Sequence, residues 1–124
     1  MSKIKLVKTG KEFGHYSQAT VHNGTVYVAG TLGVFPDDIS YIGTIEEQAE
    51  QALKNIQAVL ETAGSDLQHL LTVTIFVLDM SVAPKVNEVY SRLLGEHKPA
   101  RAMIGAAGLP RGFHIEIMAT AAVK

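Results

Sequence analysis

The 124 residues predict an α+β fold, a mixed sheet of about six strands with two helices packed on one face. Three observations support this prediction. Two stretches place apolar residues at the helical period of 3.6, and the remaining apolar stretches alternate with a period of two, as strands do. Short turn signals rich in Gly, Pro and Asn separate these stretches. No linker, repeat or low-complexity tract divides the chain, so residues 1–124 are expected to form one domain.

The first quarter of the chain is predicted to form three strands. A short edge strand covers residues 4–7, and a polar loop leads to an extended segment that ends at Val21. Asn23-Gly24 lies between two β-rich runs and predicts a type I′ hairpin, because both central positions of that turn need a positive φ. The third strand runs from Thr25 to Thr31. Residues 30–43 then form a long loop, which in a compact domain is often functional.

Two amphipathic helices are predicted in the middle of the chain. Thr44 and Glu47 have the spacing of a capping box at the start of the first helix, and Gly64 follows its last residue. Its apolar stripe comprises Ala49, Ala52, Leu53, Ile56, Val59, Leu60 and Ala63. Ser81 or Asp79 caps the second helix. The buried face of that helix is predicted to contain Val82, Val86, Val89, Tyr90, Leu93 and Leu94.

Three further strands complete the predicted sheet. One covers residues 70–78, and the last two, 102–108 and 113–121, are joined by a turn rich in Pro and Gly. If this turn is tight, the last two strands pair and Arg101 lies near Ala119. Glu116 would then lie about 10 Å away along the strand, at about 3.3 Å per residue.

The second face of this sheet is apolar as well. Residues 102–107 alternate small and apolar side chains on both sides, and neither side is hydrophilic. Large exposed apolar faces are rare in monomers, so we expect an oligomer whose sheets pack together. The alternative is a monomer whose sheet is half exposed.

Composition excludes several classes of function. Eleven Lys and Arg residues balance twelve Asp and Glu residues, which gives no electrostatic footprint for nucleic acid or an anionic membrane. The absence of cysteine excludes disulfides and thiolate chemistry. The N-terminus lacks a signal-peptide core and no apolar run approaches the roughly 18 residues of a membrane span. We therefore expect a soluble, cytoplasmic protein.

No metal site is expected. His114 and Glu116 match the first half of a zinc deaminase motif, but the cysteine pair that completes such a site is absent. The five histidines show no ligand spacing.

One cation and one carboxylate lie in the otherwise apolar C-terminal strands. Arg101 follows a Pro-Ala pair, and Glu116 lies between two isoleucines. Burying an unpaired charge is costly, so such groups pair with each other or meet a charged ligand. We interpret them as ligand-binding groups. Alternatively, Arg101 forms an interface salt bridge, and Glu116 pairs with Arg111 or is an interface carboxylate.

The same residues carry a family resemblance. Pro99-Ala100-Arg101, Gly108-Leu109-Pro110 and Ile115-Glu116-Ile117 resemble the C-terminal signature of the Rid family, the enamine/imine deaminases also known as YjgF or endoribonuclease L-PSP proteins. The resemblance covers nearly the whole chain in order, through residues 14–19, 28–30, 51–55, 74–77 and 86–90. It implies a chorismate-mutase-like α+β fold and a homotrimer whose sheets form a central barrel, with three clefts at the subunit interfaces.

The resemblance also implies an activity. Rid proteins hydrolyse 2-aminoacrylate-type enamines or their imine tautomers, which pyridoxal-phosphate enzymes release, to a 2-keto acid and ammonia without a metal or cofactor. Arg101 would grip the substrate carboxylate in a bidentate manner, and a backbone amide near Met103 would add a second contact. Glu116 would orient or deprotonate the attacking water, or pass a proton to nitrogen.

Further positions match the family's cleft. Tyr16, Asn87 and Thr31 are expected to line it, although Tyr16 is as easily explained by packing and Asn87 by solvation or a bond to the backbone. The chain departs from the family pattern at four positions. Met103 stands where members often have Cys, and only its backbone is expected to act. Ala29 stands where many members have serine, and Thr31 and Gly33 replace residues that are commonly Gln and Pro. These departures bear on the substrate range.

Two other functions remain as alternatives. A non-catalytic protein would bind small carboxylates such as 2-keto acids in the same clefts through Arg101. An endoribonuclease or translation inhibitor is the second alternative, and the net charge of −1 and the lack of a basic stripe argue against it. The expected partner is a small 2-imino or 2-keto carboxylate, with neither a membrane nor nucleic acid.

Overall fold

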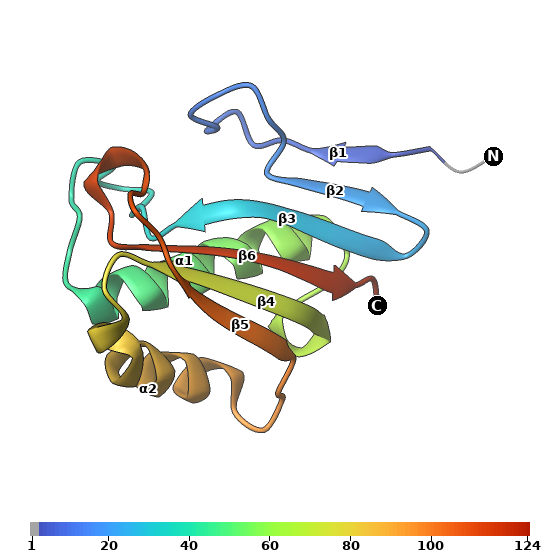
Figure 1. Ribbon diagram of the computed structural model, residues 1–124. Helices are drawn as coiled ribbons and strands as arrows, with labels where there is room; N and C mark the ends of the chain where they lie inside the picture. Colours follow the sequence, from blue (N-terminus) through green and yellow to red (C-terminus); the bar gives the residue numbers. More distant parts are fainter. Residues whose placement is uncertain (1–2) are drawn as a thin grey trace.

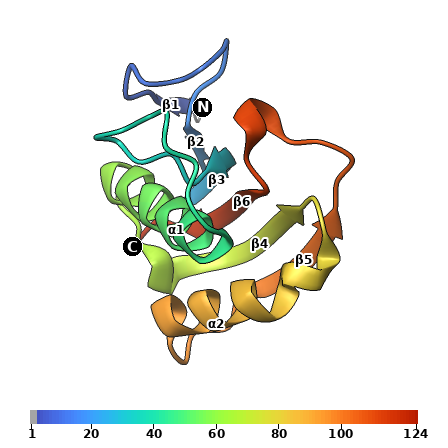
Figure 2. The same ribbon diagram turned by 90° about the vertical axis from the view of Figure 1, so that its left-hand side faces the viewer.

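The structure, a computed structural model, describes residues 3–124 and contains six strands and two α-helices within them (Figure 1). The strands are β1 (Lys5–Val7), β2 (Ala19–His22), β3 (Thr25–Leu32), β4 (Leu70–Val77), β5 (Ala100–Gly105) and β6 (Ile115–Ala122). The helices are α1 (Ile45–Thr62) and α2 (Ala83–Leu94). Both helices lie on one side of a single sheet (Figures 1 and 2). The predicted fold class, with two helices on one face, is confirmed.

The order of the strands differs from the simplest expectation. The sheet runs β1-β2-β3-β6-β4-β5, with β4 and β5 parallel and all other neighbours antiparallel. The prediction that the last two strands pair as a hairpin is wrong, because β4 lies between them. The segment that connects β5 to β6 passes the end of β4. The Ala106 N–H donates to the Val77 carbonyl at 2.8 Å, and the Leu78 N–H donates to the His114 carbonyl at 3.2 Å.

Local signals in the sequence correspond to the observed turns and caps. Asn23 and Gly24 have φ values of 51° and 80°, as a type I′ hairpin between β2 and β3 requires. The Thr44 hydroxyl accepts from the Glu47 N–H, and the Glu47 carboxylate accepts from the Thr44 N–H, which completes the predicted capping box. Asp79 provides the second cap, by accepting from the Ser81 N–H at 2.9 Å in a 3₁₀ turn that precedes α2.

The core lies between the helices and the inner face of the sheet. Every residue of the predicted α1 stripe is buried there. Gln48 is the polar exception. Its amide donates to the Gly43 carbonyl, and its oxygen accepts from the His114 N–H at 2.9 Å, which fixes the start of β6 against α1. Gly33 lies so close to the Gln48 backbone that a Cβ would overlap it, so this departure from the family pattern has a packing reason.

The outer face of the sheet is open and apolar. Tyr27, Ile104 and Met118 are exposed there by 49%, 44% and 43%, on three different strands. Exposure on this scale over one face is typical of an interaction surface. Within residues 3–124, no helix has the length and apolar character needed to cross a membrane.

Candidate active site

Arg101 projects from the edge strand of the sheet. On β5 it lies opposite Val73 of β4, which is buried beneath the helices, so the arginine leaves the strand on the helix side. Its guanidinium carbon lies 4.9 Å from the centre of the Tyr90 ring on α2. This distance allows a cation–π interaction that holds the guanidinium in place while leaving its N–H groups free for a ligand. Arg101 itself is exposed.

Tyr90 supports this arginine, a role that the sequence analysis missed. The sequence identified Tyr90 only as part of the buried face of α2. It is 9% exposed, and its hydroxyl has no hydrogen-bond partner among the described residues. Burial raises the pKa of Tyr90, and the nearby Arg101 charge partly opposes that rise. Tyr90 lies on the helix that precedes the strand of Arg101, and only the fold brings the ring and the guanidinium together.

The same edge carries two further predicted site residues. Asn87 lies three residues before Tyr90 on α2 and is exposed. Met103 lies opposite Ile75 and packs partly against the core, which leaves its backbone on the outer edge of the sheet. Arg101, Asn87 and Met103 therefore form one group, at the α2–β5 edge.

Glu116 belongs to a second group, on the opposite side of the sheet. Its neighbours Ile115 and Ile117 are buried on the helix side, so the alternation of β6 directs Glu116 to the open face. The carboxylate lies over Gly30, where the Cβ of any other residue would overlap a carboxylate oxygen. Gly30 falls in a β-bulge, because the register between β3 and β6 shifts between Val28 and Thr31.

The Glu116 carboxylate is half-buried and unpaired. None of the hydrogen bonds and ion pairs formed by residues 3–124 involves it. Burial alone raises the pKa of Glu116 above the ordinary carboxyl value. The proposed pairing with Arg111 is not formed, because the Arg111 guanidinium lies over the Phe13 ring instead. A carboxylate with a raised pKa and no partner is suited to accept and return a proton.

Tyr16 and Thr31 lie at the same end of the sheet as Glu116. The Ala29 N–H donates to the Gln18 carbonyl at 2.9 Å, which attaches the loop containing Tyr16 to the bulge. Tyr16 is exposed, and its hydroxyl oxygen accepts from the Phe13 N–H at 3.3 Å. The Thr31 hydroxyl donates to the Ala29 carbonyl at 2.8 Å, so its hydrogen is used within the bulge.

One chain does not bring Arg101 and Glu116 together. Arg101 aligns through Val73 with Ala119 of β6, three residues from Glu116. That offset is about 10 Å along the strands, with about another 10 Å across two strand spacings. The two side chains also leave the sheet on opposite faces.

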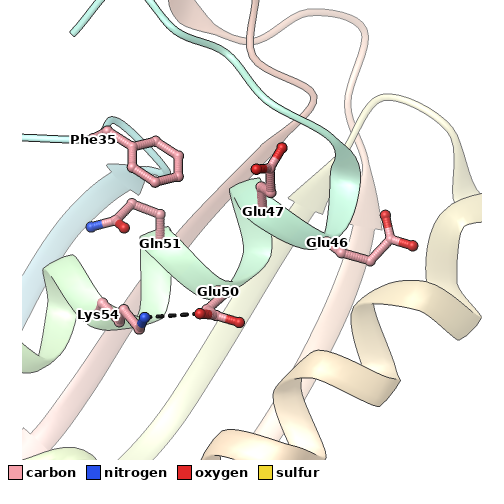
Figure 3. Close-up of a pocket in the computed structure, with 6 residues that line it drawn as sticks. All are labelled: Phe35, Glu46, Glu47, Glu50, Gln51 and Lys54. Carbon is pink, nitrogen blue, oxygen red and sulfur yellow. Dashed lines mark ion pairs between the residues drawn. The ribbon is translucent and has the colours of Figure 1, made fainter. Parts of the chain in front are cut away.

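A hollow on the surface of α1 is a poor alternative site. It has a volume of about 230 Å³ and is lined by Phe35, Glu46, Glu47, Glu50, Gln51 and Lys54 (Figure 3). Lys54 and Arg92 each bind the Glu50 carboxylate at 2.8 Å and hold its pKa at about 2. The carboxylates repel an anionic ligand, and within residues 3–124 no cluster of His, Asp or Glu is suited to hold a metal ion.

Comparisons with known proteins identify the family. The model of the endoribonuclease L-PSP family matches residues 9–123. The 2-iminobutanoate/2-iminopropanoate deaminase of Rattus norvegicus is 38% identical over 127 residues, covering 98% of this chain and 93% of the relative.

Solved structures of family members agree closely in fold. RidA from the Antarctic bacterium Psychrobacter sp. superposes with a TM-score of 0.91 at 34% identity, over 96% of this chain and 99% of that one. E. coli TdcF with bound serine superposes with a TM-score of 0.90 at 27% identity, over 97% of this chain and 99% of that one. The chain therefore belongs to the endoribonuclease L-PSP family, the Rid (YjgF) family that its sequence resembles.

Proposed function

We propose that this protein hydrolyses reactive 2-enamine or 2-imine carboxylates of the 2-aminoacrylate type. Water adds to the imine carbon, the carbon–nitrogen bond then breaks, and the products are a 2-keto acid and ammonia. The imine carbon is already electrophilic, so the tasks left to the protein are to orient the substrate and move protons. Relatives 36–38% identical to this chain and named 2-iminobutanoate/2-iminopropanoate deaminase support this proposal.

The unpaired carboxylate of Glu116 is the observation that supports the chemistry most directly. Burial raises its pKa, so it exchanges protons closer to neutral pH than an ordinary carboxyl group. In the ionised form it takes a proton from the attacking water and passes it to the imine nitrogen, which gives a carbinolamine. It then takes the hydroxyl proton of the carbinolamine and passes it to the nitrogen as the carbon–nitrogen bond breaks, so that the nitrogen leaves as ammonia and the carbon becomes a keto group. Its position over Gly30 fixes the carboxylate relative to the bulge.

Arg101 is assigned the substrate carboxylate. A guanidinium binds a carboxylate through two parallel N–H bonds, which sets orientation as well as charge. The Tyr90 ring beneath it restricts the guanidinium before the substrate arrives. Asn87 and the backbone near Met103 share this edge and are proposed to add contacts to the same ligand.

We further propose that each complete site forms between two copies of the chain in a homotrimer. Arg101 and Glu116 leave the sheet on opposite faces, so one copy supplies the carboxylate grip and its neighbour supplies the base. The open face around Glu116 exposes Tyr27, Ile104 and Met118, apolar side chains that assembly would cover. Tyr16 would enter the site from the copy that supplies Glu116, whereas Thr31 pairs with Ile117, on the helix side of the sheet.

The release of 2-keto acid tests this function. The enamine is generated in situ by a serine or threonine dehydratase, and release is followed with no added protein, with this protein and with Arg101→Ala. Arg92→Ala is the matched control, because the Arg92 side chain is engaged in an ion pair with Glu50 of α1. We expect the wild type and Arg92→Ala to accelerate 2-keto acid release and Arg101→Ala not to do so.

Two other outcomes would redirect the assignment. Acceleration that persists in Arg101→Ala would contradict the role of Arg101. If no acceleration occurs, calorimetric titration with 2-ketobutyrate distinguishes a binding protein from an inactive one, and an assay with single-stranded RNA tests the ribonuclease suggested by the family's name.

A further inference from the structure

Arg111 adopts a backbone conformation that its side chain does not favour. Its φ is 61° and its ψ is 20°, in the left-handed region, between Pro110 and Gly112. An arginine is strained in this region, whereas a glycine is not. A strained residue persists when its surroundings compensate, so the contacts of its side chain indicate what the conformation achieves.

The Arg111 side chain contacts the loop between β1 and β2. Its guanidinium carbon lies 4.0 Å from the centre of the Phe13 ring, within the range of a cation–π interaction. None of the ion pairs formed by residues 3–124 involves Arg111. Beside it, Ile42 lies 3.4 Å from where a Cβ on Gly112 would be, so the turn is also supported from the α1 side. The stacking on Phe13 therefore joins two loops that are distant in sequence and lie at the same end of the sheet (Figure 1).

Phe13 in turn fixes Tyr16. The Phe13 N–H donates to the Tyr16 hydroxyl oxygen at 3.3 Å, and the Tyr16 N–H donates to the Gly14 carbonyl at 3.0 Å. The Tyr16 ring lies against Gly14, 3.6 Å from where a Cβ would be. Because the hydroxyl oxygen accepts from the backbone, its own hydrogen remains available to donate to a ligand.

We propose that Arg111 is a positioning residue, which clamps Phe13 and thereby sets the direction of the Tyr16 hydroxyl at the mouth of the substrate site. This inference rests on the proposed function, in which Tyr16 enters the site, and it assigns the Tyr16 hydroxyl a hydrogen bond to the bound substrate. Phe13 is 50% exposed, so without the arginine its ring has little else to hold it. The loop then samples other positions and the donor is lost for part of the time.

Proteolysis tests the clamp without any substrate. Glutamyl endopeptidase cleaves after Glu12, beside Phe13, and cleavage after Glu96, on a connection far along the chain, serves as the internal reference. We expect Arg111→Gln to accelerate cleavage after Glu12 by about two- to five-fold, the range of an exposed cation–π interaction. In a Phe13→Leu background the same change should have almost no effect, and Arg111→Lys should restore most of the protection. Equal acceleration in both backgrounds would overturn the clamp.

Arg111→Gly separates the clamp from folding stability. Glycine removes both the guanidinium and the backbone strain, so the variant should unfold no more easily than the wild type while its loop is cleaved faster. If its loop stays protected, the Arg111 side chain is not what holds Phe13.

Steady-state kinetics then tests the positioning role. For Arg111→Gln we expect KM to rise about two- to five-fold with kcat nearly unchanged, by the same cation–π range. In a Tyr16→Phe background the change should not raise KM further. If Arg111→Gln accelerates cleavage only when Phe13 is present but leaves KM unchanged, Arg111 clamps the loop without positioning Tyr16. A wild type without deaminase activity would contradict the proposed function while leaving the proteolysis result intact.

Discussion

The two charged residues of the candidate site differ in the place of their strand in the sheet, in the face they leave and in their exposure. Arg101 projects from an edge strand toward the helices, rests on the Tyr90 ring and stays exposed to solvent. Glu116 projects from a central strand toward the open face, lies over Gly30 and is half-buried. Within residues 3–124, neither side chain forms an ion pair.

This difference shows how one small domain keeps two opposite charges available. Neighbouring charges on one face would pair, and the pair would lower the pKa of the carboxylate and reduce its value as a base. Here Arg101 keeps its hydration and remains a cation ready for an anion. Glu116 loses part of its hydration, and its pKa rises. Separation on two faces preserves both properties, and under the proposed function a second copy and a substrate would bring the two groups together.

Assemblies that mix an Arg101 variant with a Glu116 variant give the largest expected effect, because they test directly whether the two groups act from different copies. Arg101→Ala and Glu116→Gln should each reduce kcat/KM by about 10²-fold or more on their own. When the two variants are unfolded together and reassembled, a site between copies can combine an intact Arg101 with an intact Glu116. Random mixing should then restore about a quarter of the wild-type activity, since one site in four draws both intact groups. No recovery after verified mixing would mean that each site lies within one chain.

Gly30→Ala should have the next largest effect on activity, since it disturbs the Glu116 carboxylate and leaves Arg101 unchanged. The added methyl group would overlap the carboxylate and force it away from the bulge. A displacement of about 1 Å at a reacting group costs about 10²-fold in rate. Gly108→Ala is the control, because a Cβ there meets no atom within 4 Å. Initial rates of 2-keto acid release compare the two variants, and equal rates would show that the close approach at Gly30 is unimportant.

The stability of Glu116→Gln should depend on pH. The folded state raises the pKa of Glu116, so between the ordinary and the raised value the folded protein binds more protons than the unfolded chain. Stability contributed by this group is complete below the ordinary value and is lost as pH rises through the raised one. A glutamine at this position does not titrate, so the Glu116→Gln variant lacks this loss. Its urea midpoint should exceed that of the wild type at pH 8 and approach it at pH 4. Measurements at one protein concentration keep assembly constant. A constant difference between the two pH values would contradict the raised pKa.

Substitution of Tyr90 should give the smallest effects, and it tests whether the Tyr90 ring orients the Arg101 guanidinium. Tyr90→Phe keeps the ring and removes a buried hydroxyl without a partner, so stability should stay the same or rise by about 1 kcal/mol. Its KM should match that of the wild type. Tyr90→Leu removes the ring beneath Arg101, and KM should rise about two- to five-fold. If Phe and Leu give the same KM, the stacking does not orient the guanidinium.

The sequence predicted features that depend on few neighbouring residues. The capping box at Thr44, the hairpin at Asn23-Gly24 and the buried stripe of α1 each follow from spacing within a single element. The order of the strands could not be predicted from the sequence. The alternation of apolar residues shows which side chains of a strand share a face, but it does not show which strands are neighbours in the sheet. The connection between β5 and β6 has the composition of a tight turn, yet it passes the end of β4.

The sequence proposed the residues of the candidate site but not their geometry. The resemblance drew attention to Arg101 and Glu116, but their placement on opposite faces depends on β4 lying between their strands. Gly30 gave a usable signal, since a glycine at a strand position often marks a bulge or a close approach. Nothing in the local sequence marks Arg111 for a left-handed backbone.

The central position of β6 also governs how the chain reaches its fold. β6 comes last among the six strands in the order of synthesis, and it pairs with both β3 and β4. Until it leaves the ribosome, the two halves of the sheet expose unpaired edges to other nascent chains. Pairing across such sequence separations slows folding and lengthens this exposure. For this domain, translation through β6 is therefore the step that allows the two halves to join as one six-stranded sheet.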